Sequence, residues 1–239
     1  MHSRQHASIV FTDFTDGRGI EDIGLLTYTD GALMNTVENR SQIGIVAMLA
    51  SNSRPRTPVT NFEEFKAKNM ESCETIPAVP IMWKSQKSPR VATSSHAAEI
   101  QGLFLGLDMS CVLRTFLAEI IYGNPLIAIQ TDIRNDNLNV IRALHQLGNI
   151  GENKRLQTVI ESMKELVDES AINSISFTPG SLNIADEMTK VTPANMTHVL
   201  SMRNELRIPT REFISKKHMR THNAKQWMLR EEKFPEYRK

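Results

Sequence analysis

The order of apolar runs along this chain constrains its fold more than any other feature. Three strand-length runs come first, and later strands alternate with segments that have the spacing of amphipathic helices. Consecutive strands favour antiparallel pairing, whereas strand–helix alternation favours parallel pairing. The sequence therefore predicts an α/β fold, with a five-stranded mixed sheet of three antiparallel and then two parallel strands and with helices on both faces. The expected strands cover residues 25–29, 43–50, 81–83, 126–129 and 175–177, and the expected helices cover residues 95–121, 138–145, 156–167 and 184–200.

Composition divides the chain into a central domain and two flanking segments. Residues 1–24 are polar and predict a poorly structured lead-in, whereas residues 25–206 hold the expected strands and helices. Within this domain, the proline-rich residues 52–80 predict an inserted surface loop with a helical turn near its middle. Residues 207–239 are interpreted as a basic C-terminal extension, which could contact phosphate or could simply be a solvated end.

Cysteine content and hydropathy indicate the environment of the chain. Cys73 and Cys111 are far apart in sequence and are predicted to be free thiols in a reducing compartment. No apolar run approaches the roughly 20 residues of a membrane span, and the first 24 residues lack the pattern of a signal peptide. We therefore expect an intracellular location, in the cytoplasm or the nucleus, without membrane attachment.

Four acidic residues occupy positions from which carboxylates can converge on a metal ion. Asp30 and Asp132 follow apolar strands, and Glu99 and Asp186 begin helices. Sites in α/β sheets gather at the carboxyl ends of strands, so Asp30 and Asp132 are expected side by side if their strands are parallel neighbours. Packed carboxylates repel unless cations neutralise them, and Mg²⁺ prefers oxygen ligands. The set therefore predicts two Mg²⁺ ions, with Mn²⁺ as an alternative, acting in phosphodiester hydrolysis.

Each of these acidic residues has an ordinary structural interpretation when it is considered alone. Asp30 before a glycine is typical of a turn, and a lone Glu99 early in a helix compensates the helix dipole. Asp132 and Asp186 could each cap a secondary-structure element. Only their common order and placement favour a metal site.

Five motifs resemble the ribonuclease H domain of Ty1/copia-type retrotransposon (reverse transcriptase) polyproteins, over roughly residues 25–206. The last of the five, which contains Asp186, is the most specific. Two departures are Gly31, where the family usually has alanine, and Ala97, where it often has an acidic residue. The motifs are Tyr28-Thr29-Asp30, Trp83-Lys84-Ser85-Gln86-Lys87, Ser94-Ser95-His96-Ala97-Ala98-Glu99, the amphipathic stretch from Glu152-Asn153-Lys154-Arg155-Leu156 through Ile160 to Lys164-Glu165, and Phe177-Thr178-Pro179-Gly180 followed by Ala185-Asp186-Glu187-Met188-Thr189-Lys190.

The resemblance implies a ribonuclease H-type hydrolase that cuts RNA paired to DNA. It carries over Asp30, Glu99, Asp132 and Asp186 as catalytic metal ligands. The implied partners are an RNA–DNA hybrid and either a reverse transcriptase domain on another chain or the parent polyprotein.

Basic residues near the expected site could hold the phosphates of a nucleic acid. Phosphate contacts position a duplex without reading its sequence. A solvated loop or helix face is the alternative interpretation of each residue. The predicted substrate-binding set is Lys84, Lys87, Arg90, Arg155 and Lys190.

Two other interpretations stay open at the level of the sequence. The chain could be a catalytically inactive ribonuclease H-like module that binds nucleic acid or protein. It could also be a retroelement remnant without a selected activity.

Overall fold

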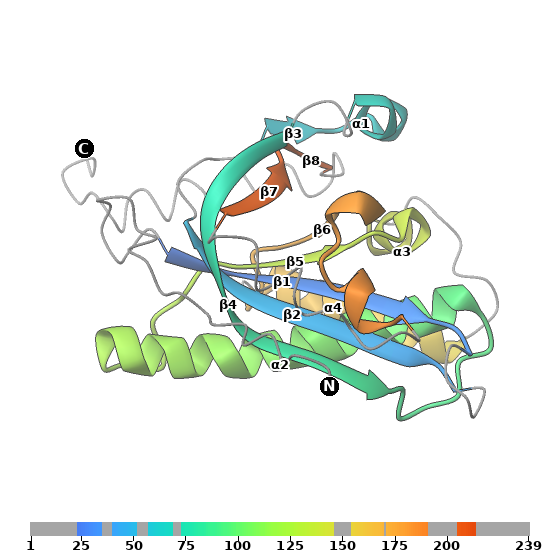
Figure 1. The fold of residues 1–239 in the computed structure, drawn as a ribbon, viewed down its shortest axis with the longest axis horizontal. Coiled ribbons are helices and arrows are strands. Elements are labelled where there is room, and N and C mark those ends of the chain that lie inside the picture. Colours follow the sequence, from blue (N-terminus) through green and yellow to red (C-terminus); the bar gives the residue numbers. More distant parts are fainter. Residues whose placement is uncertain are drawn as a thin grey trace, which may run out of the picture.

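Three long strands, β1, β2 and β4, form the middle of the sheet in this computed structural model (Figure 1). β1 spans Ile23–Ala32, β2 spans Gln42–Ser51 and β4 spans Cys73–Lys87. Residues 1–22 of the predicted lead-in, the part of the predicted last helix beyond residue 190 and most of the predicted C-terminal extension lie outside the residues that the structure describes. Residues 23 and 24, which were also expected in the lead-in, begin β1 instead. The described residues are 23–34, 40–51, 57–68, 73–145, 154–169, 171–190 and 205–213.

The strand order of the sheet is β6-β5-β1-β2-β4-β7. β2 pairs antiparallel with both β1 and β4, whereas β5 (Thr131–Asn135) pairs parallel with both β1 and β6 (Ser174–Phe177). Three antiparallel strands followed by two parallel strands confirm the predicted fold class, and the chain has a ribonuclease H-like fold. A sixth strand, β7 (Glu205–Pro209), extends the sheet by pairing with the start of β4, which the sequence did not predict.

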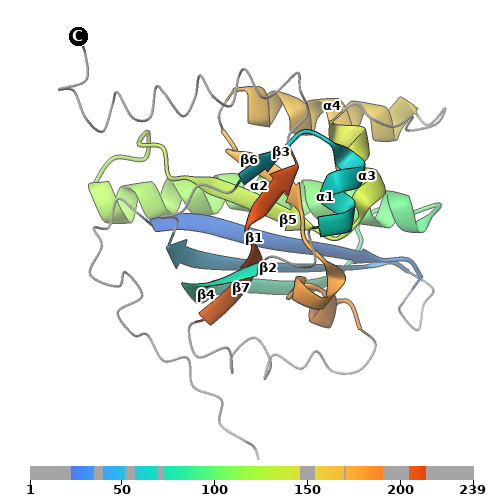
Figure 2. The ribbon, with the colours of Figure 1, turned by 90° about the horizontal axis from the view of Figure 1, so that it is seen from above.

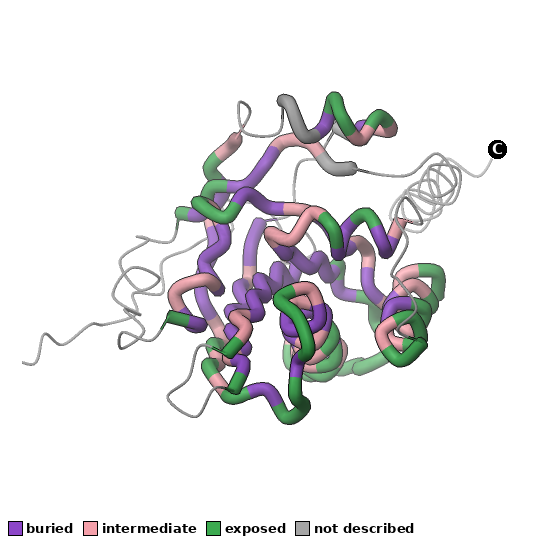
Figure 3. Tube along the Cα trace, turned by 90° about the vertical axis from the view of Figure 1, so that its right-hand side faces the viewer, coloured by how far each residue is buried: buried purple, intermediate pink, exposed green. Residues whose placement is uncertain are grey.

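Helices α2 (Ser95–Tyr122), α3 (Leu138–Leu144) and α4 (Lys154–Asp168) cover one face of the sheet. Their apolar side chains pack with Ile133 of β5 and Ile175 of β6 in one continuous core. Burial of this apolar surface drives the association of the layers, and the buried segments gather at the centre of the molecule (Figure 3). The core side chains that the helices supply include Ile100, Leu103, Leu107, Val140, Ile141, Ile160 and Met163.

The opposite face is covered by a bend of the sheet itself and by η3 (Asp186–Met188), a single turn of 3-10 helix (Figures 1 and 2). β4 curves so that its first half and β7 pack over β1 and β2 through a second apolar core. A Cβ on Gly44 of β2 would lie 2.5 Å from the carbonyl oxygen of Ala185, so the glycine permits η3 to sit directly on the strand. Within the described residues, the predicted last helix is represented only by η3.

The segment expected to be an inserted loop is part of the fold instead. It contains β3 (Thr57–Val59), α1 (Phe62–Lys68) and the first half of β4, and α1 confirms the predicted helical turn. Phe65 is fully buried and packs edge-to-face on Phe177, with 6.0 Å between the ring centroids. This contact anchors α1 to the main core. Prolines made β4 look like a loop in the sequence, yet Pro80 lies beside an irregularity in the β2–β4 pairing, where proline is tolerated.

Ordered structure also extends past residue 206, the expected end of the domain. β7 crosses that boundary, and β8 (Arg211–Phe213) pairs with β3 in a separate two-stranded sheet. Cys73 and Cys111 are free, as predicted. Among the helices that the structure describes, none combines the length and the apolar character needed to cross a membrane.

Candidate active site

Asp30 lies at the carboxyl end of β1, beneath η3. Its side chain is only 7% exposed and accepts a hydrogen bond from the hydroxyl of Thr189. Asn183 ties the same strand end to the η3 segment: its Nδ2 donates to the carbonyl oxygen of Thr29 at 3.1 Å, and its Oδ1 accepts from the amide of Ala185 at 3.2 Å. These contacts hold the chain around Asp186 close to Asp30.

Glu99 reaches Asp30 from near the start of α2, as the fifth residue of that helix. The helix begins after Ser94, whose side chain accepts a hydrogen bond from the amide of Ala97 at 3.1 Å, as an N-cap does. A Cβ on Gly31 would lie 2.4 Å from the carbonyl oxygen of Ala98, so this departure from the family pattern lets α2 approach the end of β1 closely.

Asn135, the last residue of β5, joins these elements and was not predicted to have a role. Its fully buried amide donates to Glu99 Oε2 at 3.1 Å and to the carbonyl oxygen of Thr29 at 3.2 Å. Its Oδ1 accepts from the amide of Asn137 at 2.9 Å. Asn135 therefore fixes the Glu99 carboxylate relative to β1 and to the start of α3.

The predicted position of Asp132 at the end of a strand is wrong. β5 begins at Thr131, so Asp132 pairs with Leu26 near the start of β1 and accepts a hydrogen bond from Ser174 at 2.5 Å. The apolar residues 126–129 that suggested the strand precede it, and the side chain of Leu126 is 87% exposed. The true strand was missed because its sequence is largely polar although all five of its residues are buried.

Asp136 stands where Asp132 was expected. It follows β5 directly, and the pairing of Asn135 with Thr29 places it beside Asp30. One carboxylate oxygen from each of Asp30, Glu99 and Asp136 lies within 4.8 Å of the others. A sequence signal existed, because Asp136 directly precedes Asn137, the N-cap of α3.

Crowding and burial raise the pKa values of all three carboxyl groups. Burial raises the pKa of Glu99 to about 8, with a further contribution from Asp30. Burial, again with Asp30, raises the pKa of Asp136 to about 6, and burial raises the pKa of Asp30 against the opposing hydrogen bond from Thr189. The cluster therefore holds its negative charge poorly unless a cation is present.

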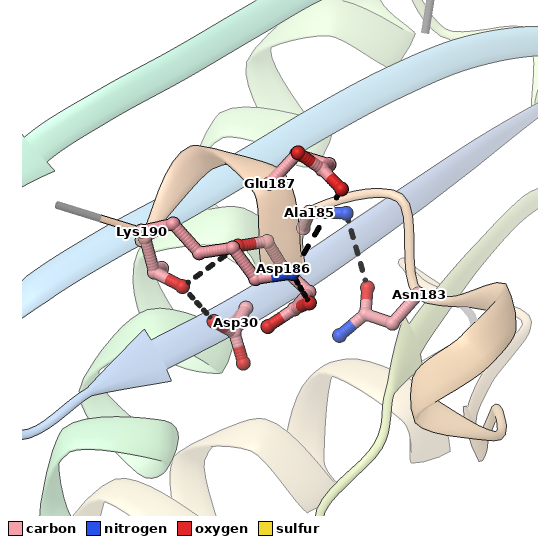
Figure 4. A network of polar contacts seen from close by, with 7 residues as sticks. Asp30, Asn183, Ala185, Asp186, Glu187 and Lys190 are labelled. Carbon is pink, nitrogen blue, oxygen red and sulfur yellow. Dashed lines mark hydrogen bonds and ion pairs between the residues drawn. The ribbon is translucent and has the colours of Figure 1, made fainter. Parts of the chain in front are cut away.

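Asp186 lies on η3 beside Asp30 (Figure 4). Its side chain is 41% exposed, so it is less buried than Asp30. Its carboxylate forms a 2.6 Å ion pair with Lys190, whose pKa is raised by this contact. The charge of Asp186 contributes to the raised pKa values of Asp30 and Asp136. The structure thus brings together Asp30, Glu99, Asp136 and, at the margin, Asp186, and it leaves Asp132 at the other end of β5.

Most of the predicted substrate-binding residues lie at the same end of the sheet. Lys87 ends β4, and exposed Arg90 lies in the connection to α2. Leu156 packs against Ala97 and Ala98 at the start of α2, which places neighbouring Arg155 near this end as well. In β4, Lys84 alternates with Ser85, which donates to the carbonyl oxygen of Met188, so Lys84 points away from η3.

The donor set fits a hard divalent cation. Asp30, Glu99 and Asp136 offer three carboxylate oxygens at one point, and oxygen ligands suit Mg²⁺ or Mn²⁺. Their raised pKa values show that the fold holds these groups where a bound cation would restore the charged forms. Asp186 would join this set only after its ion pair with Lys190 opened.

No protein-family model and no curated protein matches the sequence. An RNase H1 isolated from compost, solved in complex with an RNA/DNA hybrid, is 18% identical with a TM-score of 0.43, over 69% of this chain and 93% of that one. The N-terminal RNase H domain of a Mycobacterium tuberculosis protein is 14% identical with a TM-score of 0.43, over 75% of this chain and 97% of that domain's chain. A foamy viral protease–reverse transcriptase in complex with dsDNA is 16% identical with a TM-score of 0.42, over 72% of this chain and 94% of that one. The fold assignment rests on strand order and pairing rather than on these distant likenesses.

Proposed function

We propose that the chain is a metal-dependent endonuclease that cleaves the RNA strand of RNA–DNA hybrids and derives from a Ty1/copia-type retrotransposon polyprotein. The observation that carries this proposal is the convergence of Asp30, Glu99 and Asp136 within 4.8 Å at the end of β1. The motifs around Asp30, Glu99 and Asp186 support the retrotransposon origin, and Asp136 replaces Asp132 in the catalytic set.

The side chains of the site divide into ligands and supporting groups. A divalent cation held by Asp30, Glu99 and Asp136 would supply Lewis-acid stabilisation for phosphodiester hydrolysis. Asn135 and Thr189 hold Glu99 and Asp30 through hydrogen bonds, and Asn183 fixes the η3 segment that carries Asp186. Such contacts preserve ligand geometry when the carboxylates are ionised.

The basic residues give the hybrid a place to bind. Lys87, Arg90 and Arg155 would contact phosphates, and a hybrid would be distinguished by its shape and its 2′-hydroxyl groups. A reverse transcriptase domain, on another chain or in the parent polyprotein, is the proposed source of the hybrid. The cytoplasm or nucleus is the proposed location.

The decisive experiment compares the wild-type chain with Asp30→Asn on a labelled RNA–DNA hybrid in Mg²⁺. We expect cleavage of the RNA strand, at least about 100-fold slower in the variant because a metal ligand is lost. Double-stranded RNA, double-stranded DNA and single-stranded RNA of the same sequence should remain intact. Failure of both proteins to cut, or equal cutting by both, would refute the catalytic proposal.

The 2.6 Å ion pair between Lys190 and Asp186 favours one alternative, an inactive module that binds hybrids. Such a module would bind the hybrid without metal and would not cut it, with an affinity that falls steeply as salt rises. Lys190→Ala distinguishes the two functions. Faster cleavage by the variant would identify a nuclease that the ion pair restrains, whereas binding without cleavage in both proteins would identify the module.

A further inference from the structure

Arg134, the fourth residue of β5, carries a buried charge that the site described above does not use. Its side chain is completely buried. None of its guanidinium nitrogens has a hydrogen-bond partner within the part of the chain that the structure describes. A buried guanidinium without a counter-charge strongly destabilises a fold, so a group that neutralises it is required.

The carboxylates nearest in sequence do not supply this counter-charge. Side chains alternate along a strand, so Asp132, Arg134 and Asp136 share one face of the sheet. Asp132 accepts a hydrogen bond from Ser174, and Asp136 interacts with Asn183 and belongs to the acidic cluster. Arg134 makes no ion pair with any carboxylate among the described residues.

Two hydroxyl groups near Arg134 also lack hydrogen-bond partners within the described residues. Ser176 pairs with Arg134 on the neighbouring strand β6, and Thr178 is two residues further along. Ser176 Oγ and Thr178 Oγ1 are buried and, in the described part of the chain, also lack hydrogen-bond partners. Ile133 and Ile175 belong to the core beneath the helices, so these polar groups lie on the opposite face of the sheet.

This face of the sheet is enclosed. Tyr28, which pairs with Arg134 from β1, packs in the second core with Leu206 and Ile208 of β7. Exposure is 0% for Arg134, 1% for Ser176 and 0% for Thr178. A guanidinium and two hydroxyl groups that can all donate hydrogen bonds suit an anion, and the enclosure favours a small one over a polymer.

We propose that Arg134, Ser176 and Thr178 form an internal binding site for a small oxyanion of the phosphate class. The guanidinium would bind two of its oxygens in a fork, and the hydroxyl groups of Ser176 and Thr178 would donate to the others. The site is independent of the proposed nuclease activity, because it shares no residue with the acidic cluster.

Thermal unfolding in the presence of inorganic phosphate tests this site. Phosphate is titrated at constant ionic strength, balanced with NaCl, into the wild-type chain, Arg134→Met, Ser176→Ala and the control Ser162→Ala on α4. We expect the Tm of the wild type and of the control to rise with phosphate concentration, because a ligand that binds only the folded state stabilises it. Arg134→Met should show no phosphate dependence, and Ser176→Ala should need roughly tenfold more phosphate for the same rise.

Three results would overturn the proposal. One is a wild-type Tm that does not respond to phosphate beyond the matched NaCl control, and another is an unchanged response in Arg134→Met. If Arg134→Met does not fold, an unchanged response in both Ser176→Ala and Thr178→Ala has the same meaning. The third result comes from the same Tm measurement with a 5′-phosphorylated oligonucleotide in place of inorganic phosphate. A rise equal to that with phosphate would show that the site binds the end of a nucleic acid instead of a small ion.

Discussion

The two ends of the β1–β5 strand pair contain similar residues in different surroundings. At the start of β5, Asp132 lies beside Leu26 and accepts a hydrogen bond from Ser174. At its end, Asp136 meets Asp30 and Glu99 in a shared acidic cluster. The difference teaches that position along parallel strands, rather than the local motif, decides which carboxylate can join a metal site. Only at the carboxyl end do the starts of α2 and η3 also converge.

The most demanding test of this comparison replaces each of the two aspartates by asparagine in a separate variant. Asp136→Asn should slow hybrid cleavage by at least about 100-fold because it removes a metal ligand. The cleavage rate of Asp132→Asn should stay within about threefold of the wild-type rate. Single-turnover cleavage rates in saturating Mg²⁺ give the measurement. The reverse ranking would restore Asp132 as the ligand and refute the assignment of Asp136.

A pair of asparagines sharpens the same contrast. Asn135 at the carboxyl end holds Glu99, whereas Asn173 at the other end accepts a hydrogen bond from the Thr131 amide at 2.7 Å. Asn135→Ala should weaken metal binding roughly tenfold, the lower range for loss of a group that orients a ligand. Asn173→Ala should lower Tm without changing metal affinity. Mn²⁺ titration monitored by electron paramagnetic resonance, with Tm measured alongside, would disprove this distinction if both variants bound metal equally.

The raised pKa values predict how pH acts on the metal-free protein. Glu99, with a pKa of about 8, binds its proton more tightly in the folded than in the unfolded chain, where the pKa has its ordinary value of 4.5. Its contribution to stability is therefore present below pH 4.5 and is lost as pH rises through 8. Asp136 behaves likewise between its ordinary pKa of 3.8 and its raised pKa of about 6. We expect Tm in EDTA to fall by roughly 10 °C between pH 5 and pH 8.

Mg²⁺ and one variant provide the controls for this pH dependence. Saturating Mg²⁺ should raise Tm most at pH 8, because the cation binds the ionised carboxylates. Glu99→Gln should show a smaller fall in Tm between pH 5 and pH 8, since glutamine does not titrate. A fall of equal size in wild type and variant would assign the pH dependence to other groups.

The smallest expected effect concerns the basic residues at the active end. Arg155→Ala should weaken hybrid binding about threefold and should reduce the slope of log affinity against log salt by about one. Arg207 is an exposed arginine on β7, which pairs with the opposite end of β4, and its replacement by alanine should change neither quantity. Equal effects of the two substitutions in salt-dependent binding assays would mean that Arg155 contributes only net charge.

Much of the sheet could be predicted because its strands have distinctive local patterns. β2 is almost continuously apolar, β1 contains the strand-forming run Leu25 to Thr29, and the long helix α2 begins at a serine cap. β5 could not be located in this way, since Thr131, Asp132, Arg134 and Asn135 look exposed in the sequence and are buried only by neighbouring strands. β4 was underestimated for a related reason: local rules penalise Pro77 and Pro80, whereas the paired strands on both sides accommodate them.

Two carboxylates of the converging cluster, Asp30 and Glu99, were identifiable from sequence alone, since each marks the end of a strand or the start of a helix. Asp136 meets the same local criterion. It was missed because the strand was expected too early in the chain, so Asp132 was expected as the residue after the strand. The roles of Asn135, Asn183 and Thr189 could not be predicted, because their hydrogen bonds join segments that are remote in the chain.

The sequence by itself determined the order of strands and helices and the acidic residues at their ends, because periodicity and capping depend on neighbours along the chain. The tertiary structure alone decided which carboxylates share a site and which charges lie buried. Those outcomes depend on the register between β1 and β5 and on the folding of β4 and β7 over the sheet. Register and curvature arise from packing between distant segments, which no local pattern contains.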